Sequence, residues 1–209
     1  MLIHTFQVGI VQTNCYIVGC EETHEVAVID PGDNARRILD FVKAGGLIVR
    51  YVLNTHCHFD HIGANAEVVA GTGAKLALHP AELPVLRERG GAQWFGMEAI
   101  ESPLPDVELA DGQEIAIGSL HFQALHVPGH SPGSVAFYAA QDQAVFDGDV
   151  LFADGVGRAD LPGGDWATLK DSLQRVLFAL PDETRVYPGH GQPTTIGREK
   201  RHNPWVGQR

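Results

Sequence analysis

Four apolar segments of strand length each run into a turn that carries histidine or aspartate, with glycine or proline close by. The segments, in chain order, are "YVLNTHCHFDH", "ALHVPGHSPG", "AVFDGDVLF" and "RVYPGHG". Rigid folds present functional groups in loops at strand ends, and glycine lets the backbone pass close to a bound ion. The chain is therefore constrained to a fold in which these turns supply side chains to a common site.

Strand and helix patterns alternate along both halves of the chain. Short segments rich in β-branched and aromatic residues predict strands at 2–8, 15–19, 25–30, 47–53, 74–79, 113–118, 120–127, 134–140, 143–148 and 184–188. Helical spacing of apolar residues predicts helices at 34–43, 64–70, 80–89 and 166–179. This alternation favours an α/β protein whose sheets are covered by helices, and the length favours one domain over 1–209.

The segment 90–106 has little periodicity and holds Trp94, Phe95, Pro103 and Pro105 among its glycines. We interpret it as a long loop over one face, either a plain connection or a lid. No repeat, low-complexity tract or linker divides the chain.

The charge balance limits the partners. Fifteen basic and twenty-six acidic residues leave a formal charge of −11, which repels nucleic acid and anionic membranes. The start "MLIHTFQVGI" lacks the pattern of a signal peptide, and no run of about 18 apolar residues occurs. We expect a cytoplasmic protein without a nucleic-acid or membrane partner.

The three cysteines, Cys15, Cys20 and Cys57, show no C-x-x-C spacing. Neither a disulfide framework nor a thiolate zinc site is indicated, so any metal must be held by nitrogen and oxygen. Cys57 stands between two candidate ligands, but neighbours in an extended segment point to opposite sides, so its expected role is packing.

The first turn is the densest in potential ligands, since four of them fall within six residues: His56, His58, Asp60 and His61. Neither a core nor a surface needs such a cluster, so we favour metal ligation. The downstream turns raise the number to seven by adding His130, Asp149 and His190. This set exceeds the needs of one tetrahedral ion, and it suits zinc, with iron or manganese as alternatives.

Seven ligands fit two divalent ions that share one of them. Asp149 is the natural shared ligand, because a carboxylate has two oxygens. The expected division places His56, His58 and His130 on the first ion, and Asp60, His61 and His190 on the second. Paired ions about 3.5–4 Å apart lower the pKa of bound water and clamp the reacting oxygens, so metal-assisted hydrolysis is the reaction class indicated.

The downstream residues depend on the first cluster for their interpretation. A lone His130 or His190 would more often belong to a turn or a core, and Asp149 after a glycine would more often be a turn residue. Because the first cluster needs further ligands to complete a metal site, we interpret these three residues as those ligands. The remaining histidines are interpreted as ordinary residues: His4, His24, His79, His121, His126 and His202.

Together, "THCHFDH", "PGHSPGS", "FDGDVLF" and "YPGHG" resemble the motifs of the metallo-β-lactamase superfamily in order and rough spacing. The resemblance covers nearly the whole chain. It implies a four-layer αββα sandwich with the metal site at one edge between two sheets.

Within that superfamily the sequence is most similar to glyoxalase II-type hydrolases, particularly the short forms, through "GVGRADLPGGDW" and "TTIGREKRHNPW". Those enzymes hydrolyse the thioester S-lactoylglutathione. The resemblance implies that a metal-bridging hydroxide attacks the carbonyl, that Asp60 orients it, and that the metals stabilise the oxyanion and the leaving thiolate. The expected partner is a small thioester, with or without glutathione as its thiol.

Two basic features leave alternatives open. Arg158 matches a basic position in the family's glutathione-binding loop, and it either pairs with a substrate carboxylate or is an exposed loop cation. The one dense basic patch either binds an anion or is a solvated helix face: Arg198, Lys200 and Arg201.

Three other functions are compatible with parts of the pattern. A persulfide dioxygenase shares the scaffold but uses one iron, which His56, His130 and Asp149 could hold, although "GHGQPTTIG" lacks the aspartate–tyrosine pair expected of it. A zinc β-lactamase is disfavoured because many place cysteine where Asp149 stands and follow a signal peptide. A ribonuclease is disfavoured by the charge. The non-enzymatic alternative is a metal-binding or redox module.

Overall fold

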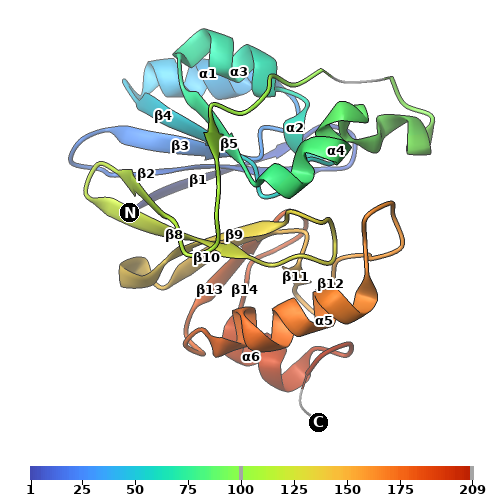
Figure 1. Ribbon diagram of the computed structural model, residues 1–209. Coiled ribbons are helices and arrows are strands. Elements are labelled where there is room, and N and C mark those ends of the chain that lie inside the picture. The colour runs from blue at the N-terminus through green and yellow to red at the C-terminus, as the bar shows by residue number, and fades with distance from the viewer. Residues whose placement is uncertain (99–100, 208–209) are drawn as a thin grey trace.

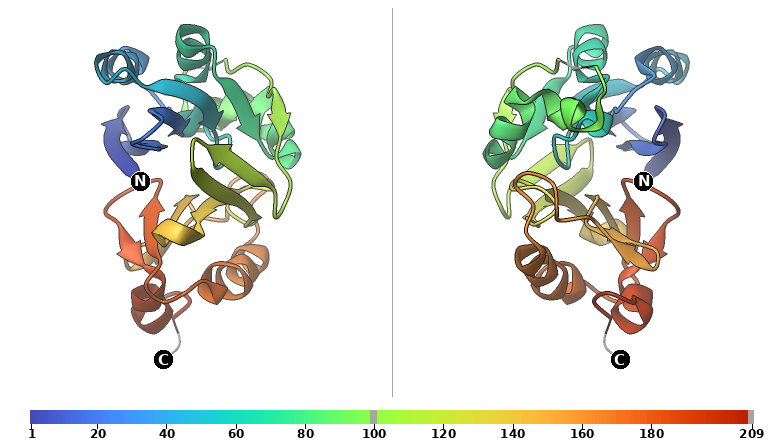
Figure 2. Two further views of the ribbon diagram at one scale, coloured as in Figure 1. Left: turned by 90° about the vertical axis from the view of Figure 1, so that its left-hand side faces the viewer. Right: turned by 90° about the vertical axis from the view of Figure 1, so that its right-hand side faces the viewer.

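The computed structural model describes residues 1–98 and 101–207, which form two six-stranded sheets stacked face to face. Helices cover the outer face of each sheet, so the layers follow the order helix, sheet, sheet, helix (Figure 1). Figure 2 shows this order from two further sides. The predicted αββα sandwich is confirmed.

The first sheet joins its strands in chain order: β1 (Leu2–Val8), β2 (Thr13–Gly19), β3 (Glu25–Ile29), β4 (Ile48–Leu53), β5 (Lys75–Leu78) and β6 (Val107–Glu108). Strands β1 to β3 pair antiparallel, whereas β3 to β6 pair parallel. Parallel neighbours need crossover connections, and α1 (Ala35–Ala44) and α3 (Asn65–Thr72) provide them on the outer face.

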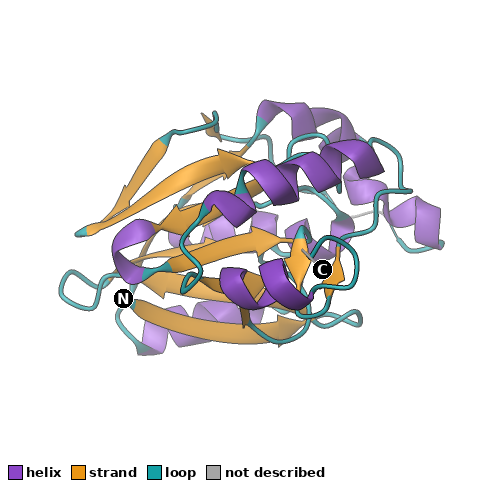
Figure 3. Cartoon of the chain, turned by 90° about the horizontal axis from the view of Figure 1, so that it is seen from below, coloured by secondary structure: helices purple, strands orange, loops and turns teal. Residues whose placement is uncertain are grey.

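The second sheet has the order β14 (Thr194–Thr195), β13 (Arg185–Pro188), β10 (Ala144–Gly148), β9 (Val135–Ala139), β8 (Leu120–His126) and β7 (Glu114–Ile117). Its outer face is covered by α5 (Trp166–Arg175), η4 (Leu177–Ala179) and α6 (Ile196–His202), as Figure 3 shows from below. A small hairpin, β11 (Leu151–Phe152) and β12 (Gly155–Val156), follows β10. Because β10 and β13 are parallel, the turns that follow them lie at the same edge.

Strand β2 shows how one segment contributes to two cores. Tyr16 and Val18 belong to the apolar cluster between the sheets, whereas Cys15 and Ile17 belong to the cluster beneath α1. Successive strand side chains point to opposite faces, and both faces of this sheet are covered, so the strand is apolar throughout its centre. The inter-sheet cluster includes three fully buried phenylalanines: Phe122, Phe137 and Phe146.

The predicted helices are largely present. Those at 34–43 and 64–70 agree with α1 and α3 within two residues, and 166–179 divides into α5 and η4. The prediction at 80–89 becomes a 3-10 turn, η1 (Pro80–Glu82), followed by α4 (Leu83–Arg87), while α2 (Phe59–Ile62) was not predicted. Among the described residues, no helix is long and apolar enough to cross a membrane.

The segment 90–106 differs from the predicted loop in its first part. The element η2 (Arg89–Phe95) consists of short 3-10 turns joined where Gly90 and Gly91 adopt φ values of 69° and 72°. Adjacent left-handed glycines let the chain change direction between two turns, which apolar periodicity does not reveal. Residues 99–100 lie outside the described residues, and the lid stays a prediction.

Candidate metal centre

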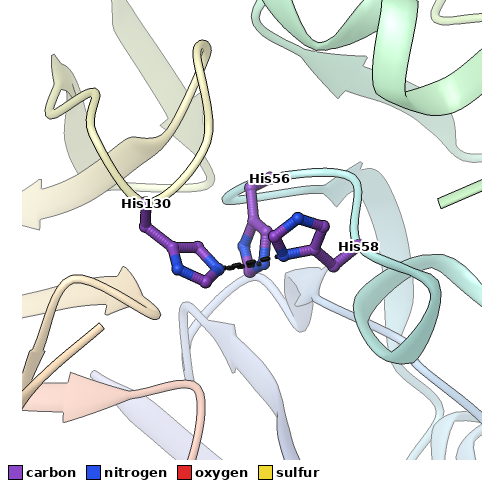
Figure 4. Close-up of side chains that lie close together, drawn as sticks. All are labelled: His56, His58 and His130. Atoms are coloured by element: carbon purple, nitrogen blue, oxygen red, sulfur yellow. Dashed lines mark hydrogen bonds between the residues drawn. The ribbon is translucent and has the colours of Figure 1, made fainter. Parts of the chain in front are cut away.

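Three histidine rings converge at the edge between the two sheets. His56 and His58 follow β4, and His130 follows β8. The Nε2 atom of His130 lies 3.2 Å from Nε2 of His56 and 3.0 Å from Nδ1 of His58 (Figure 4). All three side chains are buried. Three nitrogens that meet in this way can hold one metal ion.

Hydrogen bonds fix the orientation of two of these rings. His130 Nδ1 lies 2.7 Å from the Arg158 carbonyl oxygen, which can only accept, so Nδ1 carries the proton and Nε2 faces the cluster with its lone pair. The Thr55 hydroxyl donates to Asp30 Oδ2 over 2.6 Å and therefore accepts from His56 Nδ1, 3.1 Å away. His56 likewise presents Nε2 to the cluster.

Burial keeps two rings of the first cluster neutral. Desolvation, followed by the neighbouring histidines, lowers the pKa of His56 well below its usual value. The same causes lower the pKa of His58 to about 3. A neutral imidazole is the form that binds a metal, so neither ring needs to lose a proton near pH 7.

A second cluster contains a carboxylate and two histidines. Asp60 Oδ2 lies 3.5 Å from His61 Nε2 and 3.1 Å from His190 Nε2. The Thr13 hydroxyl donates to the same carboxylate oxygen over 2.9 Å. Burial raises the pKa of Asp60, but the positive charge of His61 and the contacts from His190 and Thr13 together lower it below its usual value. Asp60 is therefore ionised near neutral pH.

Asp149 lies between the two clusters. Its Oδ1 is 3.5 Å from His61 Nε2, while its Oδ2 is 3.5 Å from His190 Nε2 and 3.8 Å from His130 Nε2. Gly148 aims this side chain from the end of β10 with a φ of 56°, and a Cβ there would lie 2.2 Å from Thr55 Oγ1. Burial raises the pKa of Asp149, but His61 and the other histidines lower it to about 2.

The donor set fits divalent cations. All seven residues singled out from the sequence lie together, and three of them, His58, His61 and Asp149, keep a buried polar atom without a hydrogen-bond partner. Unpaired buried polar atoms are costly, and a bound cation removes that cost for His61 Nε2 and Asp149 Oδ1, which face each other. The chemistry of imidazole and carboxylate suits zinc, iron or manganese.

Comparison with known proteins identifies the family. Residues 8–190 match the sequence profile of the metallo-beta-lactamase superfamily. The chain belongs to this superfamily. Hydroxyacylglutathione hydrolase GloC of Haemophilus influenzae is 36% identical over 209 residues, which cover 99% of this chain and 98% of the relative. Persulfide dioxygenase ETHE1 of Mus musculus is 32% identical over 197 residues, which cover 92% of this chain and 70% of the relative.

Two solved structures of similar length superpose closely. The BLEG-1 B3 metallo-beta-lactamase has a TM-score of 0.93 at 36% identity and covers 98% of this chain and 99% of its own. TTHA1623, crystallised in a di-iron-bound form, has a TM-score of 0.88 at 44% identity and covers 97% of this chain and 100% of its own. These similar proteins are described with different activities, so membership in the superfamily does not specify the substrate.

One residue of this metallo-β-lactamase centre was missed in the sequence. Asp30 is buried, and its Oδ2 lies 2.9 Å from His61 Nδ1, while its Oδ1 accepts from the Thr55 amide over 2.8 Å. These contacts fix the orientation of the carboxylate, so Asp30 in turn orients His61. The signal was present, because "VIDPG" repeats the pattern of an apolar strand followed by proline and glycine.

Glu82 was also missed, and no local pattern could have revealed it. This fully buried carboxylate accepts from the backbone amide of Cys57 over 2.7 Å and from that of Gly133 over 2.7 Å. Cys57 lies between His56 and His58, and Gly133 lies three residues after His130. Glu82 therefore joins the two histidine loops, whereas its place in the sequence indicated only a helix.

The turn that carries His190 is held by β2. The Asn14 side chain donates to the carbonyl oxygens of Pro188 and Gly191 over 3.0 and 2.9 Å, and the Tyr16 hydroxyl donates to Pro188 over 2.6 Å. This turn belongs to the second sheet and β2 to the first. The contacts therefore fix the two sheets against each other at the metal centre.

Cys57 points into a separate apolar cluster with Ile62, Leu78, Val85 and Leu86. All three cysteines are free and buried. The predicted packing role of Cys57 is consistent with this placement.

The basic side chains singled out from the sequence are engaged in ion pairs. Arg158 makes two contacts to the Asp160 carboxylate, 2.7 and 2.9 Å long. Arg198 contacts Asp154 and Glu199, and the two following basic residues, Lys200 and Arg201, both contact Asp182. For the patch on α6, this pairing favours the solvated helix face over an anion site.

Proposed function

We propose that this chain is a metal-dependent hydrolase that cleaves a thioester, S-lactoylglutathione or a related one. The observation that carries the proposal is the pair of donor clusters that Asp149 joins on the floor of one pocket. The 36% identity to a hydroxyacylglutathione hydrolase over nearly the full length supports the thioester as substrate class. The partner is then a small molecule in the cytoplasm, not a nucleic acid or a membrane.

The proposed centre holds two divalent ions, zinc in the first instance, with iron or manganese as alternatives. His56, His58 and His130 would hold the first and Asp60, His61 and His190 the second. Asp149, which lies within 3.8 Å of both sets, would contact both ions. When bound, such ions lower the pKa of coordinated water and polarise a carbonyl group. The di-iron form of TTHA1623 supports a two-ion centre without deciding the metal of this chain.

The protein's own groups would position the reactants. Asp60 stays ionised and is fixed by the Thr13 hydroxyl, so it can accept a hydrogen bond from the attacking water and orient it. His190, 3.1 Å from Asp60, lies at the same end of the pocket. His56 and His58 remain neutral and keep the first cluster ready for a cation without loss of a proton.

A second candidate is a persulfide dioxygenase with one iron. The observation that favours it is the proximity of His56, His130 and Asp149, with 3.2 Å and 3.8 Å between the successive donor atoms, together with the similarity to ETHE1. This reaction needs one metal with open positions, whereas the hydrolase uses the second cluster as well. A metal-binding module without turnover is the non-enzymatic alternative.

One set of measurements separates these candidates. Protein of known metal content is assayed for hydrolysis of S-lactoylglutathione and other thioesters, and for oxygen uptake with glutathione persulfide. The hydrolase predicts two ions and thioester turnover that is lost in Asp60→Ala. One bound iron with rapid oxygen uptake would establish the dioxygenase instead. Metal binding without either activity would support the metal-binding module.

A further inference from the structure

The pocket above the donor clusters has a volume of about 360 Å³. Its floor consists of proposed metal ligands, and Arg158 lies on its wall. The rest of its lining is apolar: Val11, Phe59, Phe95, Met97 and Leu161. These side chains come from the β1–β2 turn, α2, η2 and the residues just after it, and the loop after β12. Distant parts of the chain thus supply one apolar wall.

Two of these apolar side chains are exposed at the mouth of the pocket. Val11 is 43% exposed and Phe95 is 46% exposed, although large apolar side chains are usually covered. Phe95 packs against Phe59, with ring centroids 5.5 Å apart. Exposed apolar residues that gather at a cleft mark a binding surface. Their position at the metal centre indicates that a substrate group covers them.

The lining disfavours an anionic group on the apolar wall. Arg158 is the cation of the lining apart from the histidines, and both of its contacts go to the Asp160 carboxylate. A substrate carboxylate on the apolar wall would therefore lose its hydration without gaining a free partner.

We propose that this wall binds the acyl group of the thioester, and that the enzyme prefers an unbranched aliphatic acyl chain to a hydroxylated or charged one. This inference rests on the proposed function. Water adds to the carbonyl carbon, the carbon–sulfur bond breaks, and a carboxylic acid and a thiol are released. Thiol carriers such as glutathione bear charged groups, so the carrier extends from the pocket into solvent while the acyl chain lies within it.

The first test compares thioesters that share glutathione and differ in the acyl group: acetyl, butanoyl, hexanoyl and lactoyl. Each methylene buried on the wall should raise kcat/KM about three- to fourfold until the pocket is filled. Butanoyl should exceed lactoyl. A flat series, or a preference for lactoyl, would overturn the inference and leave the proposed function intact.

Matched variants assign the preference to the wall. Val11→Ser and Phe95→Ser should each reduce the hexanoyl-to-acetyl ratio of kcat/KM at least threefold. The control is Ile10→Ser, because Ile10 lies in the same turn and is 80% exposed but does not line the pocket. Its ratio should equal that of the wild type. Equal losses in all three variants would contradict an acyl-binding role for Val11.

A binding measurement separates the inference from the proposed function. Ketone analogues, in which a methylene replaces the sulfur, cannot be hydrolysed, and calorimetry gives their affinity for the metal-loaded protein. Affinity should rise with the length of the acyl chain. If affinity rises while no thioester is cleaved, the wall binds the acyl group but the thioesterase proposal fails. If affinity does not depend on chain length, the wall does not bind the acyl group.

Discussion

The Nδ1 atom of His61 lies 2.9 Å from Oδ2 of Asp30, and both side chains are buried. Since Asp30 also accepts from the Thr55 amide and hydroxyl, its carboxylate has a fixed orientation and fixes His61 in turn. His61 thereby directs Nε2 toward Asp60 and Asp149. The second cluster thus depends on a residue outside the seven proposed ligands.

Asp30→Asn should weaken metal binding at the second cluster by about 10- to 100-fold, the usual effect of removing a carboxylate behind a ligating histidine. Competition with a chelator measures the two affinities. Asp40→Asn is the matched control, because Asp40 is exposed on α1 and pairs with Arg36. Unchanged affinity in Asp30→Asn would show that His61 is oriented without Asp30.

Glu82→Gln should destabilise the metal-free protein by about 1–3 kcal/mol. Glu82 accepts one hydrogen bond on each carboxylate oxygen, and in the variant one of the two backbone amides would face an NH2 group, which cannot accept. The first cluster should also bind metal more weakly, since the loops that carry His56, His58 and His130 lose a common anchor. Urea denaturation and metal titration measure the two effects.

The control for Glu82 is Glu67→Gln, an exposed change on α3 that should affect neither measurement. A loss of stability in Glu82→Gln with normal metal affinity would limit Glu82 to a structural role.

Acidification should release the two ions in sequence. Burial lowers the pKa of His61, but the nearby carboxylates of Asp60, Asp149 and Asp30 raise it further than burial lowers it. The pKa of His190 is also raised. Protons therefore compete with metal at these two histidines as the pH falls. The pKa values of His56 and His58 are lowered, so these rings stay neutral over the same range. Lowering the pH from 7.5 to about 5.5 should therefore remove the second ion before the first.

Metal content after dialysis at each pH measures this release. The His190→Ala variant provides the comparison, because it should bind one ion at both pH values. Simultaneous loss of both ions from the wild type would contradict the difference between the clusters.

The alternation of strand and helix patterns predicted sheets covered by helices, whereas the four-layer order came from the resemblance to the metallo-β-lactamase motifs. The sequence also singled out the seven side chains that lie together, since a turn with histidine or aspartate after a strand is a local pattern. Glu82 could not be found in this way, because its partners, Cys57 and Gly133, come close only in the folded chain. The turns of η2 were missed for a similar reason, as they depend on two left-handed glycines and not on periodicity.

Gly148→Ala should lower the free energy of unfolding by more than the strain of a left-handed alanine. Its φ is 56°, and an added Cβ would lie 2.2 Å from Thr55 Oγ1, so the β carbon would displace either Thr55 or the turn that carries Asp149. Gly46→Ala is the matched control, with a φ of 59° and nothing within 4 Å of the added Cβ. The control should lose about 1 kcal/mol through strain of the left-handed conformation.

Urea denaturation of the two metal-free variants measures the difference between them, and metal titration shows whether Asp149 has moved. Gly148→Ala should lose at least twice as much stability as Gly46→Ala, and it alone should bind metal more weakly. Equal losses of stability with unchanged metal binding would show that Thr55 yields to the added carbon. In that case Gly148 serves only the left-handed turn, and the position of Asp149 is set by its other neighbours.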